Sequence, residues 1–534
     1  MKNFAQLYQR LDGTTKTNEK VDAMVDYFAA VNALDAAWAT YFLSGNKIRR
    51  LVATKDLRVW AATQAGIPDW LFDESYHAVG DLAETMSLIV PPGSSGNDDS
   101  LADWVQHRLL PLRGMDDAET RSAVLKIWND TASPVRLVVM KLITGAFRVG
   151  VSKRLVTRAI AKHAGIPVDV AAHRLMGDWE PSEDFFRRVI HPEAQDTRTS
   201  QPYPFCLAHS IDRETGPQPL GEPGEYLVEW KWDGIRGQVI RRQGQTFIWS
   251  RGEELMENRW PEIESAAETL PDGTVIDGEI LAATDSHNVL PFAQLQRRIG
   301  RKTIGKKLLG EVPVRFFAFD VLEHAGQDVR GDTMADRRAL LERIVTTADH
   351  PNLALTERIE TESWEQLAGI RGQSRERHSE GLMLKKLSGV YDVGRVRGNW
   401  WKWKVDPFTI DAVLIYAQKG HGKRASLFTD YTFALWRDDE LVPVAKAYSG
   451  LDDAEIRKVD RFVRDHTQDS FGPVRSVDAE LVMEIAFEGL QRSTRHKSGI
   501  ATRFPRILRW RHDKQAKDAN TLADLLALLP PESA

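Results

Sequence analysis

The spacing of apolar residues changes once along the chain, near residue 200, and this change limits the folds open to it. Before that point apolar positions recur every three or four residues, as in VDAMVDYFAAVNALDAAWATYFL, which predicts amphipathic helices. From about residue 205 they alternate, as in EYLVEWKW and TVIDGEIL, with helical segments such as MADRRALLERIVTTA between them. This pattern predicts an α+β region with antiparallel strands. The polar stretch HPEAQDTRTSQPYP separates the two parts and is typical of a linker.

A third part is predicted after Asp406. Five short strand-like runs and one helical run in about 125 residues suit an OB-type β-barrel. A chain of 534 residues is also too long for one ordinary hydrophobic core. We therefore predict a multidomain fold, with an all-α domain at 1–200, an α+β domain at 205–405 and an OB-fold barrel at 406–534.

The composition indicates the cellular compartment in which the protein works. No stretch approaches the roughly 18 uncharged apolar residues that span a bilayer, and the start, MKNFAQLYQR, lacks the apolar core of a signal peptide. We expect a cytoplasmic protein with no membrane partner. Cys206 is the single cysteine, which excludes an internal disulfide and a multi-cysteine zinc site.

Charge gives a local signal only. The net charge of −5 offers no general argument for a nucleic-acid partner. Residues 491–517, however, contain nine Lys or Arg and one acid, Asp513. A segment of that charge is suited to holding phosphate.

The segment Glu229-Trp-Lys231-Trp-Asp233-Gly-Ile-Arg236 lies where one predicted strand ends and the next begins. A lysine in such a segment can attack a phosphoryl group and form a covalent intermediate. Attack requires the neutral amine, which nearby cations, desolvation and a bound Mg²⁺ favour. The alternative is an ordinary D-G hairpin turn with its charged neighbours in solvent. The first interpretation predicts further cations and carboxylates downstream.

Such residues follow in order: Arg251 in WSRGEE, Glu279 in DGE, Phe319 in FFAFDVLE, Glu380 in EGLMLKK, and Lys402 and Lys404 in NWWKWKVD. Each is ordinary by itself, because charged side chains usually face solvent and phenylalanine usually lies in a core. Together, the segments EWKWDGIR, SRG, DGE, FAFDVL, EGLMLKK, WWKWK and RFPRILRWRHDK resemble the motifs of covalent nucleotidyltransferases. More narrowly, residues 229–514 resemble ATP-dependent DNA ligases. The residue sequence of these segments is similar to that of bacterial three-domain repair ligases.

The resemblance implies a role for each matching residue. Lys231 would be the nucleophile that accepts AMP, and Glu229 would lie beside the adenine. The remaining nucleotide contacts it implies are Arg236 and Arg251 to ribose or phosphate, Phe319 stacked on the base, Glu279 to ribose, and Arg397, Lys402 and Lys404 to phosphate. Arg395 fits the place of Arg397 nearly as well. Glu279 and Glu380 would hold Mg²⁺, or Mn²⁺, because both ions accept oxygen ligands.

Two further segments resemble family features. In the C-terminal basic segment, Arg503, Arg506, Arg509, Asp513 and Lys514 are candidates for orienting pyrophosphate, with Arg509 and Lys514 as the expected ATP contacts; a plain DNA-backbone patch is the alternative. The stretch TGAFRVGVSKRLVTRA resembles a signature of the N-terminal DNA-binding domain. Its residues Arg148, Lys153 and Arg154 would grip backbone phosphates, unless they form an ordinary solvated helix face.

The function implied is an ATP-dependent DNA ligase, expected to act as a monomer on nicked duplex DNA. Lys231 would take AMP from ATP, AMP would pass to a 5′-phosphate, and a 3′-hydroxyl would displace it. One alternative is an RNA ligase or a GTP-dependent capping enzyme, which the helical N-terminal region disfavours. Another is a non-catalytic DNA-end-binding protein, which the intact set of charged motif residues disfavours.

Overall fold

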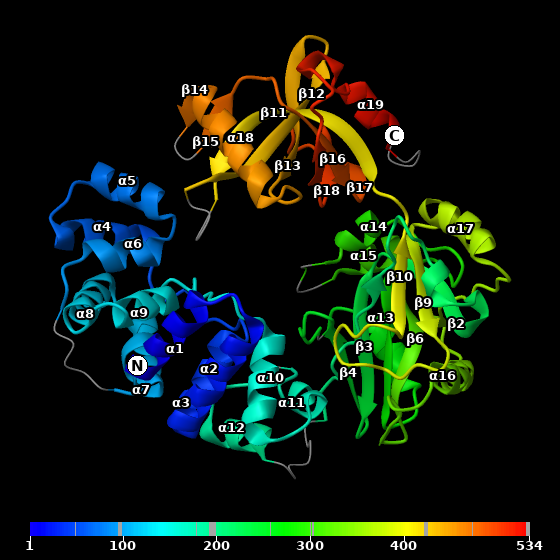
Figure 1. The fold of residues 1–534 in the computed structure, drawn as a ribbon. Coiled ribbons are helices and arrows are strands. Elements are labelled where there is room, and N and C mark those ends of the chain that lie inside the picture. The colour runs from blue at the N-terminus through cyan, green and yellow to red at the C-terminus, as the bar shows by residue number, and fades with distance from the viewer. Residues whose placement is uncertain are drawn as a thin grey trace. The chain divides into compact units, whose positions relative to one another are not determined.

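The computed structural model describes residues 1–529 except 49, 94–98, 178, 192–198, 257, 300, 302–303, 421–425 and 472–473. Most of the predicted linker after His191 therefore lies outside the described residues. The chain divides into two compact units, one of Met1–Ala23, Trp38–Ser152 and Asp406–Ala534, the other of Met24–Ala37 and Lys153–Val405. Figure 1 shows helices in the N-terminal part and both strands and helices in the rest.

The N-terminal part is helical, as the three-to-four spacing predicts. Trp104 and Trp128 are almost fully buried in it, and the buried guanidinium of Arg136 donates to the carbonyl oxygens of Val90 and Trp128, both at 2.7 Å. Its elements up to residue 152 are α1 (Lys2–Gly13), α2 (Thr17–Ala30), α3 (Ala33–Leu43), α4 (Thr54–Ala65), α5 (Asp69–Val79), α6 (Leu82–Ile89), α7 (Leu101–Asp103), η1 (Trp104–Leu109), η2 (Leu110–Gly114), α8 (Asp117–Asn129) and α9 (Val135–Ile143).

Three more helices, α10 (Lys153–Ala164), α11 (Val168–Arg174) and α12 (Glu183–Ile190), belong to the second unit. Two of them have an apolar side: Val156 and Ile160 of α10 are buried, as are Phe185, Phe186 and Val189 of α12. Ser182 caps the start of α12 by accepting a hydrogen bond from the backbone of Phe185.

The central part of the second unit contains two sheets. One has the order β1-β10-β9-β2, formed by β1 (His209–Ser210), β10 (Trp400–Lys404), β9 (Ser379–Lys386) and β2 (Tyr226–Trp232). The other has the order β4-β3-β5-β6-β7, with β8 beside β6; its strands are β3 (Ile235–Arg242), β4 (Gln245–Ser250), β5 (Thr274–Ala282), β6 (Val314–His324), β7 (Gln327–Asp328) and β8 (Leu353–Leu355). Most neighbours are antiparallel, and β1 with β10 and β6 with β8 are parallel.

Helices complete this central part. They are α13 (Pro261–Glu268), α14 (Phe292–Gln296), α15 (Lys306–Glu311), α16 (Met334–Ala348) and α17 (Trp364–Gly372), with short turns η3 (Gln218–Leu220), η4 (Pro223–Glu225) and η5 (Gln373–Arg375). Leu341 of α16 packs with Ile276 of β5 and Phe316 of β6 in one buried core. A second core, around Trp249 and Trp400, packs against the half-buried ring of Phe319.

The C-terminal part is rich in strands, in agreement with the sequence prediction. Its main sheet has the order β13-β12-β11-β15-β14, and β16 joins β11 to β19. The elements are β11 (Phe408–Lys419), β12 (Phe428–Arg437), β13 (Glu440–Ala447), α18 (Asp453–Asp465), β14 (Thr467–Phe471), β15 (Val474–Val477), β16 (Val482–Phe487), β17 (Gly489–Arg492), β18 (Ile500–Arg503), β19 (Arg506–Trp510), η7 (Ala516–Asp518) and α19 (Leu522–Ala527). Val459 and Val463 of α18 share a core with Phe433 of β12.

Candidate active site

Lys231 lies near the end of β2, just before the turn into β3. Its Nζ donates to Glu380 Oε2 at 2.5 Å, and the same oxygen lies 3.1 Å from Lys404 Nζ. The turn needs Gly234, because a Cβ there would lie 2.4 Å from the carbonyl oxygen of Ile280 on β5. The folded chain thus brings residues 231, 380 and 404 together around one carboxylate.

The two predicted carboxylates have different electrostatics. Burial favours the neutral form of Glu380, but the ammonium groups of Lys231 and Lys404 outweigh it and lower its pKa to about 2. Burial dominates at Glu279, raising its pKa to about 8 although Lys231 and Arg236 oppose the shift. Glu279 is therefore mostly protonated at pH 7 in the ligand-free protein, and Glu380 is ionised.

Arg236 is held beside Glu279 on the neighbouring strand, where the two residues are register partners. Its guanidinium makes two bonds to Asp277, at 2.6 and 3.1 Å, and donates to the carbonyl oxygen of Cys206 at 2.7 Å. It also lies 5.3 Å from the ring centroid of Phe319. The hydroxyl of Tyr391 donates to Asp277 at 2.6 Å, so Tyr391 completes a network that the motifs alone did not reveal.

Glu229 is almost fully buried and faces two cations. Its Oε1 accepts from Arg338 Nη1 at 2.7 Å and also from the hydroxyl of Thr356, while its Oε2 lies 2.6 Å from Lys385 Nζ. The ammonium of Lys385 also lies 4.2 Å from the ring centroid of Phe319. Arg338 and Thr356 were missed by sequence reasoning; Lys385 lies inside EGLMLKK, and a lysine amid apolar strand residues is the one signal that was available.

Lys402, on β10, belongs to a group of cations. Burial lowers the pKa of Lys402, and so do the positive charges of Lys231 and Arg395. Burial likewise lowers the pKa of His209, together with Arg395, Arg397 and Lys402. Arg395 and Arg397 are both exposed and lie near the same group, so the structure does not favour one over the other as the predicted phosphate contact.

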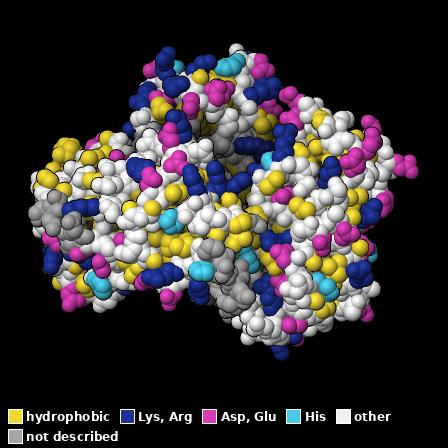
Figure 2. Space-filling view, turned by 60° about the horizontal axis from the view of Figure 1, so that its bottom comes forward, with side chains coloured by type: hydrophobic (Ala, Val, Ile, Leu, Met, Phe, Trp, Pro, Cys, Tyr) yellow, Lys and Arg dark blue, Asp and Glu magenta, His cyan; other side chains and the backbone are white. Residues whose placement is uncertain are grey.

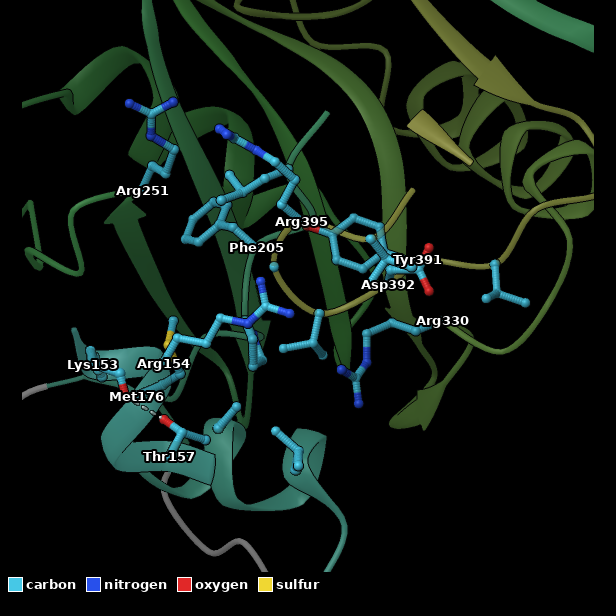
Figure 3. A pocket seen from close by; sticks show the side chains of 18 of the residues that line it. Lys153, Arg154, Thr157, Met176, Phe205, Arg251, Arg330, Tyr391, Asp392 and Arg395 are labelled. Atoms are coloured by element: carbon cyan, nitrogen blue, oxygen red, sulfur yellow. Dashed lines mark hydrogen bonds between the residues drawn. The ribbon is translucent and has the colours of Figure 1, made fainter. Parts of the chain in front are cut away.

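A cavity of about 1170 Å³ lies between α10, α11 and the loop before β10. Figure 3 shows the side chain of Arg154 extending into it from α10, with Arg251 and Arg395 at its wall. We call it the arginine groove after these three residues, which are exposed and have no acidic partner among the described residues. Its other charged lining residues include the ion pairs Lys153–Glu253 and Arg330–Asp328.

The arginine groove brings together residues that the sequence assigned to different ligands. Arg251 lines the arginine groove, although its backbone N–H bonds to the carbonyl oxygen of Arg236 at 2.9 Å. Lys153 and Arg154 line the same groove. Arg148 is exposed but belongs to the other compact unit. On the face in Figure 2, basic and acidic side chains are interspersed over much of the surface.

The C-terminal candidates are surface residues with acidic neighbours. Arg509 on β19 donates to Glu484 at 2.5 Å and stays largely exposed. Asp411 accepts from Lys514 at 2.6 Å and from Arg511 at 2.8 Å. These ion pairs hold the basic side chains against acidic residues of β11 and β16.

Oxygen ligands for a divalent cation are few. No group of three or more His, Cys, Asp or Glu suited to a metal ion occurs among the described residues. Glu279 and Glu380 both face Lys231 and supply carboxylate oxygens. Two carboxylates fit Mg²⁺ bound together with substrate phosphates, since this ion usually keeps several waters and few protein ligands.

None of the helices in the described part of the chain is long and apolar enough to cross a membrane.

Comparison with known proteins covers nearly the whole chain. Residues 1–161 match the DNA ligase N terminus, 207–404 the ATP dependent DNA ligase domain, and 424–514 the ATP dependent DNA ligase C terminal region. The chain is 31% identical to a probable DNA ligase of Koribacter versatilis, over 98% of this chain and 95% of that protein. It is 28% identical to a DNA ligase of Methanothrix thermoacetophila, over 97% and 96%. The solved structure named Pmar-Lig_PreS3 shares the fold, with a TM-score of 0.61 at 15% identity, over 95% of this chain and 99% of that one.

Two central sheets with a lysine held among carboxylates and cations define a nucleotidyltransferase domain, here flanked by a helical part and a strand-rich part. The three matched regions and the similarity to whole ligases take the assignment one step further. The chain belongs to the ATP-dependent DNA ligase family.

Proposed function

We propose that this protein seals nicks in duplex DNA through a covalent lysyl-AMP and a DNA-adenylate, with Lys231 as the nucleophile. The observation that carries the proposal is the position of Lys231 Nζ, 2.5 Å from Glu380 and beside Lys402, Lys404 and Glu279. An amine in that setting has cations nearby to stabilise a phosphoryl group under attack.

The first step is attack of Lys231 Nζ on the α-phosphorus of ATP, which breaks the bond to the β-phosphate and releases pyrophosphate. In the second, an oxygen of the DNA 5′-phosphate displaces the lysine and takes the AMP. In the third, the neighbouring 3′-hydroxyl attacks the 5′-phosphate and AMP leaves. All three are phosphoryl transfers that depend on alignment and on positive charge.

The nucleotide contacts we propose around Lys231 are those that the family resemblance implies. Phe319 offers a half-buried ring for stacking, and Glu229 lies near it through the shared Lys385 ammonium. Lys402 and Lys404 supply positive charge for the α-phosphate. Arg236 and Arg251 contact ribose or phosphate, Arg397 is the further phosphate contact, and Arg509 and Lys514 orient the pyrophosphate. Glu279 and Glu380 hold Mg²⁺, or Mn²⁺, which supplies charge neutralisation at the phosphates.

The arginine groove is the proposed path of the DNA backbone. Its residues Arg154, Arg251 and Arg395 have no acidic partner in the described structure, so their charges are available for phosphate. Lys153 and Arg148 are further candidates. We assign DNA binding through Arg148, Lys153 and Arg154 to a domain of residues 1–200, with adenylation at 205–405 and an OB-fold domain at 406–534. We also propose a monomer that works in the cytoplasm, where its DNA substrate lies.

The test uses α-phosphate-labelled ATP with the intact chain and Mg²⁺, followed by denaturation and peptide mapping. Label should be retained on the Lys231 peptide and chased onto nicked DNA. Lys231→Ala should abolish labelling yet seal pre-adenylated nicks, while Lys307→Ala, a change at a fully exposed lysine, should behave as the wild type.

Other outcomes identify the alternatives. Label from GTP instead of ATP would indicate capping chemistry, and transfer to RNA ends alone would indicate an RNA ligase. Folded protein that binds DNA but retains no label from any nucleotide would support a non-catalytic DNA-end-binding role and overturn the proposal.

A further inference from the structure

We propose that Arg338, Thr356 and Lys385 are positioning residues that fix Glu229 as a hydrogen-bond acceptor and thereby select a 6-aminopurine nucleotide over a 6-oxopurine nucleotide. The inference rests on the proposed function, because it assumes that the base of ATP lies beside Phe319 and Glu229. None of the three residues touches the reacting atoms.

The three residues reach Glu229 from different parts of the fold. Arg338 comes from α16, Lys385 from β9 and Thr356 from the segment after β8, while Glu229 itself lies on β2. All four are buried, with at most 7% of any residue exposed. A carboxylate that is contacted by side chains from three different segments has little freedom to rotate, so its oxygens keep one orientation.

The contacts also determine which oxygen can accept a further bond. Oε1 already accepts from Arg338 and from the hydroxyl of Thr356. Among the residues that the structure describes, Oε2 contacts only the ammonium of Lys385, at 2.6 Å. Since each carboxylate oxygen has two lone pairs, Oε2 retains capacity for one more donor.

Lys385 links this oxygen to the proposed base-stacking ring. Its Nζ donates to the carbonyl oxygen of Phe319 at 3.0 Å and lies 4.2 Å from the Phe319 ring centroid. One ammonium therefore holds both the edge-binding carboxylate and the ring. A base stacked on Phe319 would have its edge close to Glu229 Oε2.

The chemistry of the base edge then gives selectivity. Adenine has an amino group at position 6, which donates to a carboxylate, whereas hypoxanthine and guanine have an oxygen there, which repels it. Both carboxylate oxygens of Glu229 are already turned toward donors on Arg338, Thr356 and Lys385, so this side chain meets the base edge as an acceptor. Arg338 is itself held through its Nε by Glu342 at 2.7 Å. A site that leaves a buried polar group facing the wrong partner discriminates strongly.

The experiment measures lysyl-nucleotide formation from ATP and from ITP, which differ at position 6, as kcat/KM for the intact protein. Wild type should prefer ATP. Thr356→Val and Arg338→Met should lower the ATP-to-ITP ratio by on the order of tenfold, the effect of one misplaced hydrogen bond, mainly through the KM for ATP. Arg343→Met, an exposed position on the same helix, is the matched control and should keep the wild-type ratio.

The outcomes separate the two proposals. If the wild type forms no lysyl-AMP, the proposed function fails. If it forms lysyl-AMP but accepts ITP equally, or if the ratio is unchanged in a folded Thr356→Val protein, this inference alone is overturned. Thr356→Val replaces only one hydroxyl with a methyl group. It therefore still tests the inference if the Arg338→Met protein fails to fold.

Discussion

Glu279→Gln should stabilise the ligand-free protein at alkaline pH and at the same time abolish adenylation. Glu279 is a half-buried carboxyl whose surroundings disfavour its charge, and its pKa is raised from 4.5 to about 8. Glutamine has nearly the same shape and never ionises. The substitution therefore removes the unfavourable charge together with a proposed Mg²⁺ ligand.

The magnitude follows from proton linkage. The unfolded chain releases this proton near pH 4.5, whereas the folded protein keeps it until about pH 8. Between those values the folded state binds more protons, so the free energy of unfolding falls as the pH rises. Each pH unit corresponds to about 1.36 kcal/mol, which sets an upper bound of about 5 kcal/mol on the loss above pH 8. Below pH 4.5 the effect is absent.

The assay is denaturant unfolding of the wild type and Glu279→Gln at pH 5 and pH 8.5, without nucleotide or metal. The stability difference between variant and wild type should increase in the variant's favour between the two pH values, by several kcal/mol. Glu268→Gln, at an exposed position on α13, should show no such change. A difference for Glu279→Gln that is the same at both pH values would refute the electrostatic reasoning.

Three further predictions concern individual steps. Changing both Arg509 and Lys514 to alanine should slow lysyl-AMP formation far more than the sealing of pre-adenylated nicks, as single-turnover rates will show; equal damage to both would indicate a plain DNA patch. Changing Arg154 and Arg251 to alanine should weaken nicked-DNA binding and reduce the slope of log affinity against log salt by about 2, since each lost phosphate contact contributes about 0.9; an unchanged slope would remove the arginine groove from the DNA path. Chelating divalent metal should abolish lysyl-AMP formation, and Mn²⁺ should restore it; labelling that persists in the chelator would exclude the proposed role of Glu279 and Glu380.

Sequence reasoning predicted the fold well in segments where apolar residues recur at a regular spacing. The helices of the N-terminal part and the strands of the central and C-terminal parts follow their apolar spacing, and the three-part fold is confirmed. The proposed boundaries at residues 200 and 406 stay predictions. Periodicity reports which face of an element is buried but not which elements pack together, so it could not reveal that α10 and α11 line a cavity with the loop before β10.

For the site, the motifs predicted residues that lie together despite long separations, such as Lys231 and Glu380. The motifs could not reveal the residues from other segments that contact these side chains. Arg338, Thr356 and Tyr391 lie outside the motifs, and their contacts exist only once β2, α16 and the neighbouring segments have packed. The nucleotide role of Arg251 stays a prediction, and the SRG motif could not reveal that this residue also lines the arginine groove.

The bond between Lys231 and Glu380 has a consequence for the resting protein in the cell. Lysine amines are slowly modified by cyanate, aldehydes and acyl phosphates, all of which require a free nitrogen lone pair. Lys231 Nζ lies against a carboxylate at 2.5 Å, with Lys404 at the same oxygen, and only 21% of its side chain is exposed, so small electrophiles have restricted access to it. The arrangement shields the proposed nucleophile from chemical ageing until a substrate displaces its partner.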